Sequence, residues 1–164
     1  FVLREAYMEN TKDLHFYAQK VRFYNELKKG IRDELTAARK SLSAQATATA
    51  DWVKQDPDNR QSENAPVSYT GSSFSTMPDY DGEKGMVPKP TTAMVAFEIN
   101  IKGKLEAYIK GLEEKLNSVG DDAQLANVDL QNMLQKQQQT LQMMSNISKM
   151  LHDTAMAVIR KIGG

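Results

Sequence analysis

Residues 3–42 read LREAYMENTKDLHFYAQKVRFYNELKKGIRDELTAARKSL, and mostly apolar side chains recur in them at alternating steps of four and three. This spacing keeps an apolar seam on one side of a slightly underwound helix, which is how long helices pair as coiled coils. The sequence therefore predicts a coiled-coil helix over residues 1–43. The members of this N-terminal stripe are Leu3, Tyr7, Asn10, Leu14, Tyr17, Val21, Tyr24, Lys28, Ile31, Leu35, Ala38 and Leu42.

A second stripe of the same spacing lies near the C-terminus, where residues 130–162 read LQNMLQKQQQTLQMMSNISKMLHDTAMAVIRKI. It predicts a second coiled-coil helix over residues 121–162, which Gly163 and Gly164 end. We expect the two long helices to pair as an antiparallel coiled coil in an all-α fold, either within one subunit or between neighbouring subunits. The members of this C-terminal stripe are Leu130, Leu134, Gln137, Leu141, Met144, Ser148, Leu151, Ala155, Val158 and Ile162.

Polar residues interrupt both stripes, at Asn10 and Lys28 in the first and at Gln137 in the second. A polar residue on such a seam commonly fixes the register and the oligomeric state. The second helix also carries a face rich in glutamine, whose uncharged amides are less costly to bury between subunits than Lys or Glu. Phe16 and Phe23 lie beside the N-terminal stripe and widen it. These features predict that each long helix meets several partners.

The middle of the chain, residues 44–90, lacks any helical periodicity. It holds all five prolines of the chain, which break helices and block central strands. We expect a long irregular insert there, with a short pair of strands around Val67–Phe74. The residues Asp79–Glu83 faintly resemble the opening of a calcium loop, but the later bidentate glutamate of such a loop is missing. A turn built on Asp-Gly is the better interpretation.

A third, shorter helix is expected over residues 91–119, where apolar residues are again spaced by threes and fours. Thr91 or Thr92 would supply its N-cap, and Gly120 would end it in the left-handed conformation before the next helix begins at Asp121. Gly103 and Gly111 lie inside this helix. They leave flat patches where another backbone could approach.

The composition excludes several classes of function. The 164 residues include 21 basic and 21 acidic side chains and no cysteine, so neither nucleic-acid binding, nor disulfides, nor thiolate metal sites are expected. The sequence has no apolar run long enough for a membrane span and no secretory signal pattern. Because the chain begins with Phe1, we expect that residues before it have been removed or are not included.

The sequence does not predict an enzyme. It contains no glycine-rich phosphate loop, no nucleophile elbow and no paired-histidine zinc motif, and no cofactor is expected. His15 and His152 are the only histidines, one on each long helix and both off the stripes. Two ligands make a poor metal site, and neither histidine has the Glu-x-x-His spacing of a di-metal helical bundle.

The tail Leu151–Ile162 is amphipathic and ends in aliphatic side chains. Together with long terminal helices around a less regular middle and the lack of cysteine, it resembles bacterial secreted filament subunits, namely flagellin-type proteins and the filament and needle proteins of type III secretion systems. The resemblance is one of layout at both ends of the chain. The sequence departs from flagellin in its first helix, which is rich in aromatic residues.

The resemblance implies a structural, non-enzymatic subunit that self-assembles through its terminal helices into a helical filament outside the cell or on its surface. The apolar members of both stripes would form the assembly seam, and residues 44–90 would face outward. The partners would be further copies of the chain, and a secretion chaperone or a cap protein would be a further partner. The alternative is a soluble coiled-coil adaptor or chaperone-like helical bundle, which needs the same seams but closes them within one molecule or a dimer.

Overall fold

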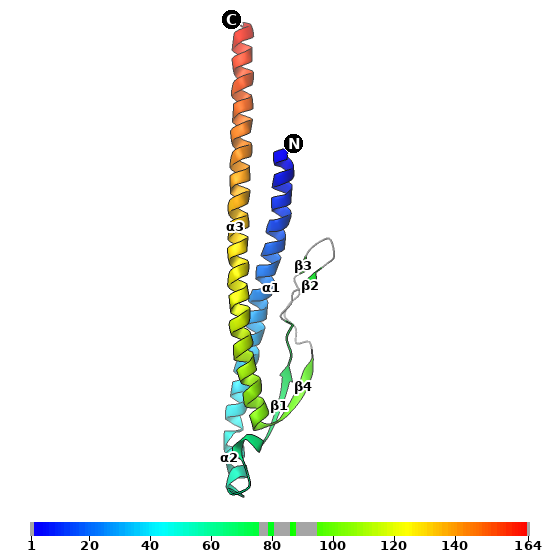
Figure 1. The fold of residues 1–164 in the computed structure, drawn as a ribbon, viewed down its shortest axis with the longest axis vertical. Coiled ribbons are helices and arrows are strands. Elements are labelled where there is room, and N and C mark those ends of the chain that lie inside the picture. The colour runs from blue at the N-terminus through cyan, green and yellow to red at the C-terminus, as the bar shows by residue number, and fades with distance from the viewer. Residues whose placement is uncertain (1, 76–78, 81–85, 88–94, 164) are drawn as a thin grey trace. The chain divides into compact units, whose positions relative to one another are not determined.

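The computed structural model describes residues 2–75, 79–80, 86–87 and 95–163 (Figure 1). The described part is mostly helical, and the long N- and C-terminal helices predicted from the two stripes are both present. The elements in chain order are α1 (Val2–Ala44), α2 (Ala46–Lys54), the 3-10 turn η1 (Ser62–Asn64), β1 (Pro66–Ser72), β2 (Asp79–Tyr80), β3 (Met86–Val87), β4 (Ala96–Ile101) and α3 (Lys102–Gly163).

The C-terminal half of the chain differs from the prediction. Residues 96–101 form a strand, and α3 then continues for 62 residues without a break at Gly120. The predicted separate helix over 91–119 and the predicted start of a new helix at Asp121 are therefore wrong. Val119 and Ala123 are both almost fully buried, so the apolar face runs past Gly120 without a change of direction. Thr91 and Thr92 lie outside the described residues.

The chain divides into two compact units. The first consists of residues 1–18 and 126–164, and the second of residues 19–125. The second unit contains nearly all of the buried apolar residues. Apart from Ala65, which lies between η1 and β1, they come from α1, α3 and the strands. They are Phe23, Tyr24, Leu27, Ile31, Leu35, Ala38, Ala65, Val67, Ile99, Leu105, Ile109, Leu112, Val119 and Ala123.

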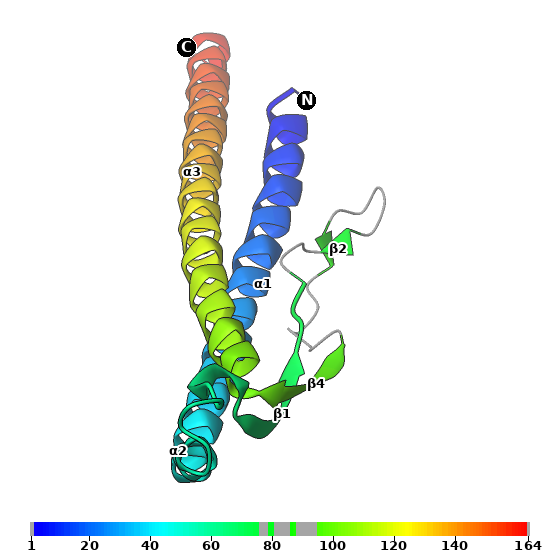
Figure 2. The ribbon, with the colours of Figure 1, turned by 60° about the horizontal axis from the view of Figure 1, so that its bottom comes forward.

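Within the second unit, β1 and β4 form an antiparallel pair in which Tyr69 lies opposite Ile99 and Gly71 opposite Phe97 (Figure 2). The predicted pair of strands around Val67–Phe74 is wrong: this segment forms one strand, β1, and its partner is the distant β4. Two shorter strands, β2 and β3, pair with each other. The predicted turn at Asp79–Glu83 falls largely outside the described residues.

The outer edge of β1 is bonded to side chains of other elements. The Gln45 amide accepts from the Ser68 backbone N–H at 2.7 Å and donates to the Ser68 carbonyl at 3.1 Å. The Ser72 N–H donates to the Tyr108 hydroxyl at 2.8 Å. Gln45 lies between α1 and α2, and Tyr108 lies on α3, so these bonds tie the strand to the helices of its unit.

A close contact between η1 and α3 explains Gly103. A Cβ atom at this position would lie 3.0 Å from the Glu63 carbonyl oxygen, which is tighter than most Cβ contacts in proteins. The prediction that this glycine lets another backbone approach the helix is confirmed. At Gly111 an added Cβ atom would meet nothing within 4 Å.

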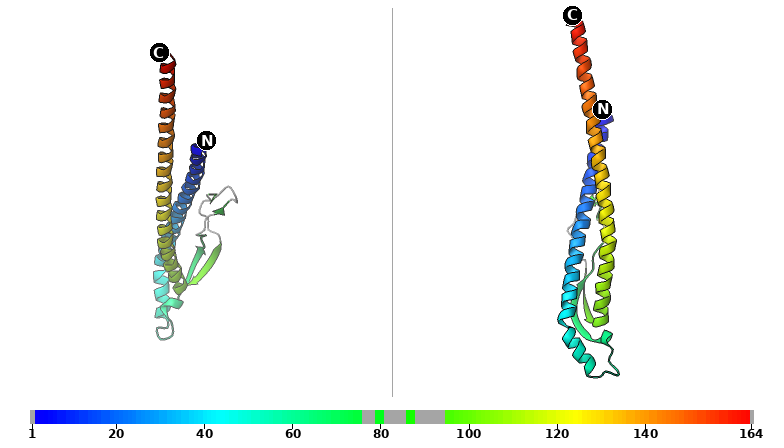
Figure 3. Two further views of the ribbon diagram at one scale, coloured as in Figure 1. Left: turned by 45° about the horizontal axis from the view of Figure 1, so that its top comes forward. Right: turned by 90° about the vertical axis from the view of Figure 1, so that its left-hand side faces the viewer.

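Within the first unit, α1 and α3 lie side by side and run in opposite directions (Figure 3). The Asn10 amide donates to the Thr140 hydroxyl at 3.1 Å, and the Gln137 amide donates to the Thr11 hydroxyl at 3.3 Å. Asn10 is only 2% exposed, which is rare for an asparagine and is balanced by this hydrogen bond. The C-terminal end of α3 extends beyond the first turn of α1 (Figure 3).

Candidate functional site

The apolar residues of the N-terminal stripe pack against other parts of the same chain. In the second unit Tyr24, Ile31 and Leu35 are buried. Every other stripe residue of α1 is half-buried, apart from the buried Asn10 and Ala38. The half-buried apolar members are Leu3, Tyr7, Leu14, Tyr17, Val21 and Leu42. Most of the surface of this stripe is therefore already occupied within one chain.

The C-terminal stripe is split between two faces of α3. Leu130 and Met144 are half-buried, whereas Leu134 is 42% exposed and Leu141 is 45% exposed. Met133, Gln137 and Thr140 are half-buried, and Gln137 and Thr140 are hydrogen-bonded to α1 in the first unit. The half-buried residues of this part of α3 therefore include Met133 and Thr140, whereas Leu134 and Leu141 lie next to them and are exposed.

The end of α3 presents apolar side chains that nothing in the described chain covers. Every residue from Ser145 to Gly163 is exposed, although the segment is helical throughout. Leu151 is 67% exposed and Ile162 is 81% exposed. We refer to the large apolar side chains of this segment as the C-terminal apolar surface: Ile147, Met150, Leu151, Met156, Val158, Ile159 and Ile162.

An uncharged polar face precedes this surface on α3. A shallow hollow of about 480 Å³ is lined by Gln138, Gln139, Gln142, Met143 and Asn146. The Gln142 amide donates to the Asn146 side-chain oxygen at 3.2 Å. Because amides carry no charge, covering this face costs less desolvation free energy than covering lysines or glutamates.

A cluster that the sequence did not reveal lies in the second unit, where Glu34 meets Tyr69 and Tyr108. The Tyr69 hydroxyl donates to Glu34 Oε1 at 2.7 Å, and the Tyr108 hydroxyl lies 2.8 Å from the same oxygen. Burial raises the pKa of both tyrosines above the ordinary value of 10, and the hydrogen bond to Glu34 adds to the increase. The sequence contains one indication of this cluster: Glu34 is an acidic residue directly before Leu35, a buried member of the N-terminal stripe.

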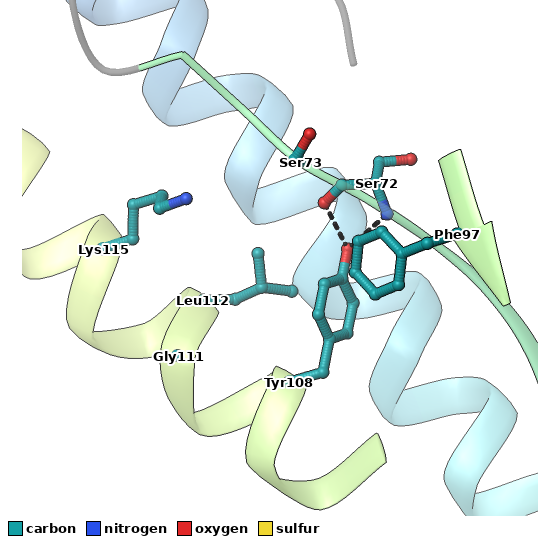
Figure 4. A pocket seen from close by; sticks show the side chains of 7 residues that line it. All are labelled: Ser72, Ser73, Phe97, Tyr108, Gly111, Leu112 and Lys115. Carbon is teal, nitrogen blue, oxygen red and sulfur yellow. Dashed lines mark hydrogen bonds between the residues drawn. The ribbon is translucent and has the colours of Figure 1, made fainter. Parts of the chain in front are cut away.

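A hollow of about 260 Å³ lies next to this cluster, between the end of β1 and α3 (Figure 4). Its lining is mainly apolar. The Phe97 ring stands edge-on to the Tyr108 ring, with the ring centroids 5.4 Å apart, and it remains 39% exposed. The residues that line the hollow are Ser72, Ser73, Phe97, Tyr108, Gly111, Leu112 and Lys115.

The structure does not assemble a metal site or a membrane span from the residues that it describes. Across these residues no group of three or more His, Cys, Asp or Glu side chains could hold a metal ion. His15 and His152 are both exposed. No helix in the described ranges combines the length and the apolar character needed to cross a membrane. Comparisons with protein-family models, with curated proteins and with solved structures found no match.

Proposed function

We propose that the chain is a structural subunit that self-assembles into an extracellular helical filament, with the C-terminal apolar surface as a principal contact between copies. One observation carries the proposal: a helical segment of α3 exposes several large apolar side chains and meets no other described part of the chain. Contiguous exposed apolar surface commonly marks a site of protein association.

The free energy of association would come mainly from burying this surface. Full burial of one Leu, Ile or Val side chain contributes about 1.5–3 kcal/mol. Several such side chains on one helix can therefore offset the loss of translational and rotational freedom, which costs about 4–15 kcal/mol. The neighbouring amide face extends the contact area without adding charge that must be desolvated.

We also infer that α1 and α3 pair as an antiparallel coiled coil within each subunit. The stripe on α1 follows alternating steps of four and three over its whole length, and its members are at least half-buried. One line of buried and half-buried residues along α3 follows the same rule. Its members are Leu105, Ile109, Leu112, Leu116, Val119, Ala123, Ala126, Leu130, Met133, Gln137, Thr140 and Met144.

This arrangement divides the assembly seam into two roles. The α1 stripe would hold the subunit together, whereas Leu151, Val158 and Ile162 would contact the next copy. If their contact lies on a different surface of that copy, the interface is heterologous and repeats without closing, which produces an open filament. A secretion chaperone or a cap protein could cover the same surface before or at the end of assembly.

The test compares the full chain with the double variant Leu151→Asp/Val158→Asp by light scattering and negative-stain microscopy over a range of protein concentrations. The unmodified chain should form elongated polymers whose mass grows with concentration. The double variant should remain monomeric because two carboxylates at this surface would have to be desolvated on association. Val95→Asp is the matched control: the exposure of Val95 lies between those of Leu151 and Val158, but Val95 lies just before β4, so polymers should still form.

Two results would contradict the proposal. Discrete dimers of the unmodified chain at every concentration and salt condition would favour the soluble coiled-coil adaptor instead. Polymers that persist in the double variant but disappear in Val95→Asp would show that assembly depends on the middle of the chain and not on the end of α3.

A further inference from the structure

The hollow between β1 and α3 in the second unit combines an apolar floor with a cation at its edge. Gly111 has no side chain, and a Cβ atom there would meet nothing within 4 Å, so this stretch of α3 leaves open space next to Leu112. The exposed part of the Phe97 ring forms another side of the same hollow. A flat apolar group could therefore lie on the helix backbone at Gly111 and against the Phe97 ring.

Most polar groups of the lining are already bonded within the chain. The Tyr108 hydroxyl accepts the Ser72 N–H and lies 2.8 Å from both the Ser72 carbonyl oxygen and Glu34 Oε1. Because a hydroxyl carries a single proton, Tyr108 has no donor left for a ligand. The Ser73 hydroxyl donates to the Val95 carbonyl at 3.4 Å, a long bond that a better acceptor could replace.

Lys115 is the one charged residue among those that line the hollow. It is half-buried, and within the described residues its amino group forms no hydrogen bond or ion pair. In Figure 4 this amino group faces the strand segment that carries Ser72 and Ser73. A cation without a protein partner at the edge of an apolar hollow favours an anion with an apolar body, because the charge and the apolar surface then both find a complement.

We propose that this hollow binds a small aromatic carboxylate of one or two fused rings. The ring system lies on Gly111 and Leu112 against the edge of Phe97, and the carboxylate accepts hydrogen bonds from the Lys115 amino group and the Ser73 hydroxyl. The volume of about 260 Å³ is below the usual range for drug-sized ligands, which limits the ligand to this size. This proposal does not depend on filament assembly, because every lining residue lies outside the C-terminal apolar surface.

The test is isothermal titration calorimetry of the full chain with 2-naphthoate, and with the uncharged 2-naphthamide as a comparison ligand. The carboxylate should bind saturably, and the amide should bind several times more weakly. Lys115→Gln should lower the affinity for 2-naphthoate by up to about fivefold, the effect of losing one partly exposed ion pair. Gly111→Leu should abolish binding by filling the hollow, while its circular dichroism spectrum and melting temperature show that the fold is kept.

Lys110→Gln is the matched control, because Lys110 is an exposed lysine on the same helix that does not line the hollow. Its affinity for 2-naphthoate should equal that of the unmodified chain. The proposal is wrong if the unmodified chain gives no saturable heat at millimolar ligand, or if the amide binds as tightly as the carboxylate. It is also wrong if Leu151→Asp/Val158→Asp abolishes the binding and Gly111→Leu leaves it intact, which would place the ligand on the C-terminal apolar surface.

Discussion

Glu34 on α1 is bonded to both the strand pair and the other long helix of the second unit. Its Oε1 atom lies within hydrogen-bonding distance of Tyr69 on β1 and Tyr108 on α3. The two tyrosine rings are also in contact, with centroids 6.1 Å apart. Since hydrogen bonds to a charged group contribute about 1.5–3 kcal/mol each, the loss of one of these three side chains weakens the attachment of β1.

The tyrosine cluster predicts a loss of stability in alkaline solution. In the folded state the pKa of Tyr69 and of Tyr108 lies above the ordinary value of 10, so the unfolded chain releases these protons first. The contribution to stability is therefore fully present below pH 10 and decreases as the pH rises above it. Urea-unfolding midpoints measured on both sides of pH 10 should show this decrease. In the Tyr108→Phe variant the midpoint should decrease less steeply with pH. A midpoint of the unmodified chain that does not depend on pH would contradict the raised pKa of the two tyrosines.

Two glycines of the second unit predict opposite responses to the same substitution. At Gly71 an added Cβ atom would lie 3.0 Å from the Phe97 ring and 3.2 Å from the Ile99 side chain, so Gly71→Ala should destabilise the chain by about 1–3 kcal/mol. Gly111→Ala adds a methyl group in open space within a helix and should stabilise it by about 1 kcal/mol. Chemical denaturation measures both. Equal effects of the two substitutions would contradict the packing described around Phe97.

At the scale of the elements, the sequence predicted the long helices but divided the C-terminal one incorrectly. Gly120 followed by two aspartates has the local chemistry of a helix end and a new N-cap, yet the buried residues on both sides of it share one face. Because that continuity depends on what α1 covers, local sequence could not reveal it. The sequence also assigned Leu134 and Leu141 to the stripe. These side chains are more apolar than Met133 and Thr140, which are half-buried in their place.

The strand β4 shows the same limit in another form. Phe97 and Ile101 fit a helical spacing with Leu105, so periodicity alone favoured a helix there. Pairing with β1 decides the outcome, and that partner lies far away in the sequence. Likewise, the Glu34 cluster could not be predicted, because its three residues come from segments far apart in the sequence. The aliphatic tail of α3 could be identified from the sequence as a candidate contact surface, because its apolar side chains lie close together on one helix.

The pairing of α1 with α3 in the first unit predicts a specific role for Asn10. The Thr140 hydroxyl also donates to the Lys136 carbonyl at 3.0 Å, so replacing Asn10 leaves it bonded. Asn10→Leu should therefore raise the free energy of unfolding by about 1 kcal/mol while loosening the register between the helices. The chain has no cysteine, so engineered disulfides can report the register.

The pair Thr11→Cys/Gln137→Cys matches the observed contact, and Thr11→Cys/Met144→Cys matches a register shifted by one heptad. In the presence of Asn10 only the first pair should form a disulfide efficiently. With Asn10→Leu the second pair should form one as well. A destabilised Asn10→Leu variant with an unchanged register would contradict the prediction.

At the scale of the whole molecule, the chain separates residues that hold the fold together from residues that remain available. Almost all fully buried apolar side chains belong to the second unit, whereas the exposed end of α3 belongs to the first. The net charge of zero removes long-range repulsion between copies. Loss of the free end should therefore affect assembly far more than folding.

Truncation after Ile147 tests this separation. Residues 148–163 are all exposed, so their removal should change the free energy of unfolding by less than about 0.5 kcal/mol. The truncated chain should no longer form polymers in light scattering. Deletion of Pro66–Ser72 is the contrasting variant: it removes the buried Val67 and the bond between Tyr69 and Glu34, so it should lower the melting temperature. A truncated chain that still polymerises would contradict the separation.

The bonds along the outer edge of β1 also affect how copies can aggregate. An edge strand with free peptide groups is a template on which a strand from another molecule can add, and repeated addition leads to cross-β fibres. At Ser68 and Ser72 those positions are taken by the Gln45 amide and the Tyr108 hydroxyl. A second β-strand would have to displace both side chains before it could pair along this edge. The edge thus resists amyloid-type growth in a protein whose proposed function requires many copies to remain close together.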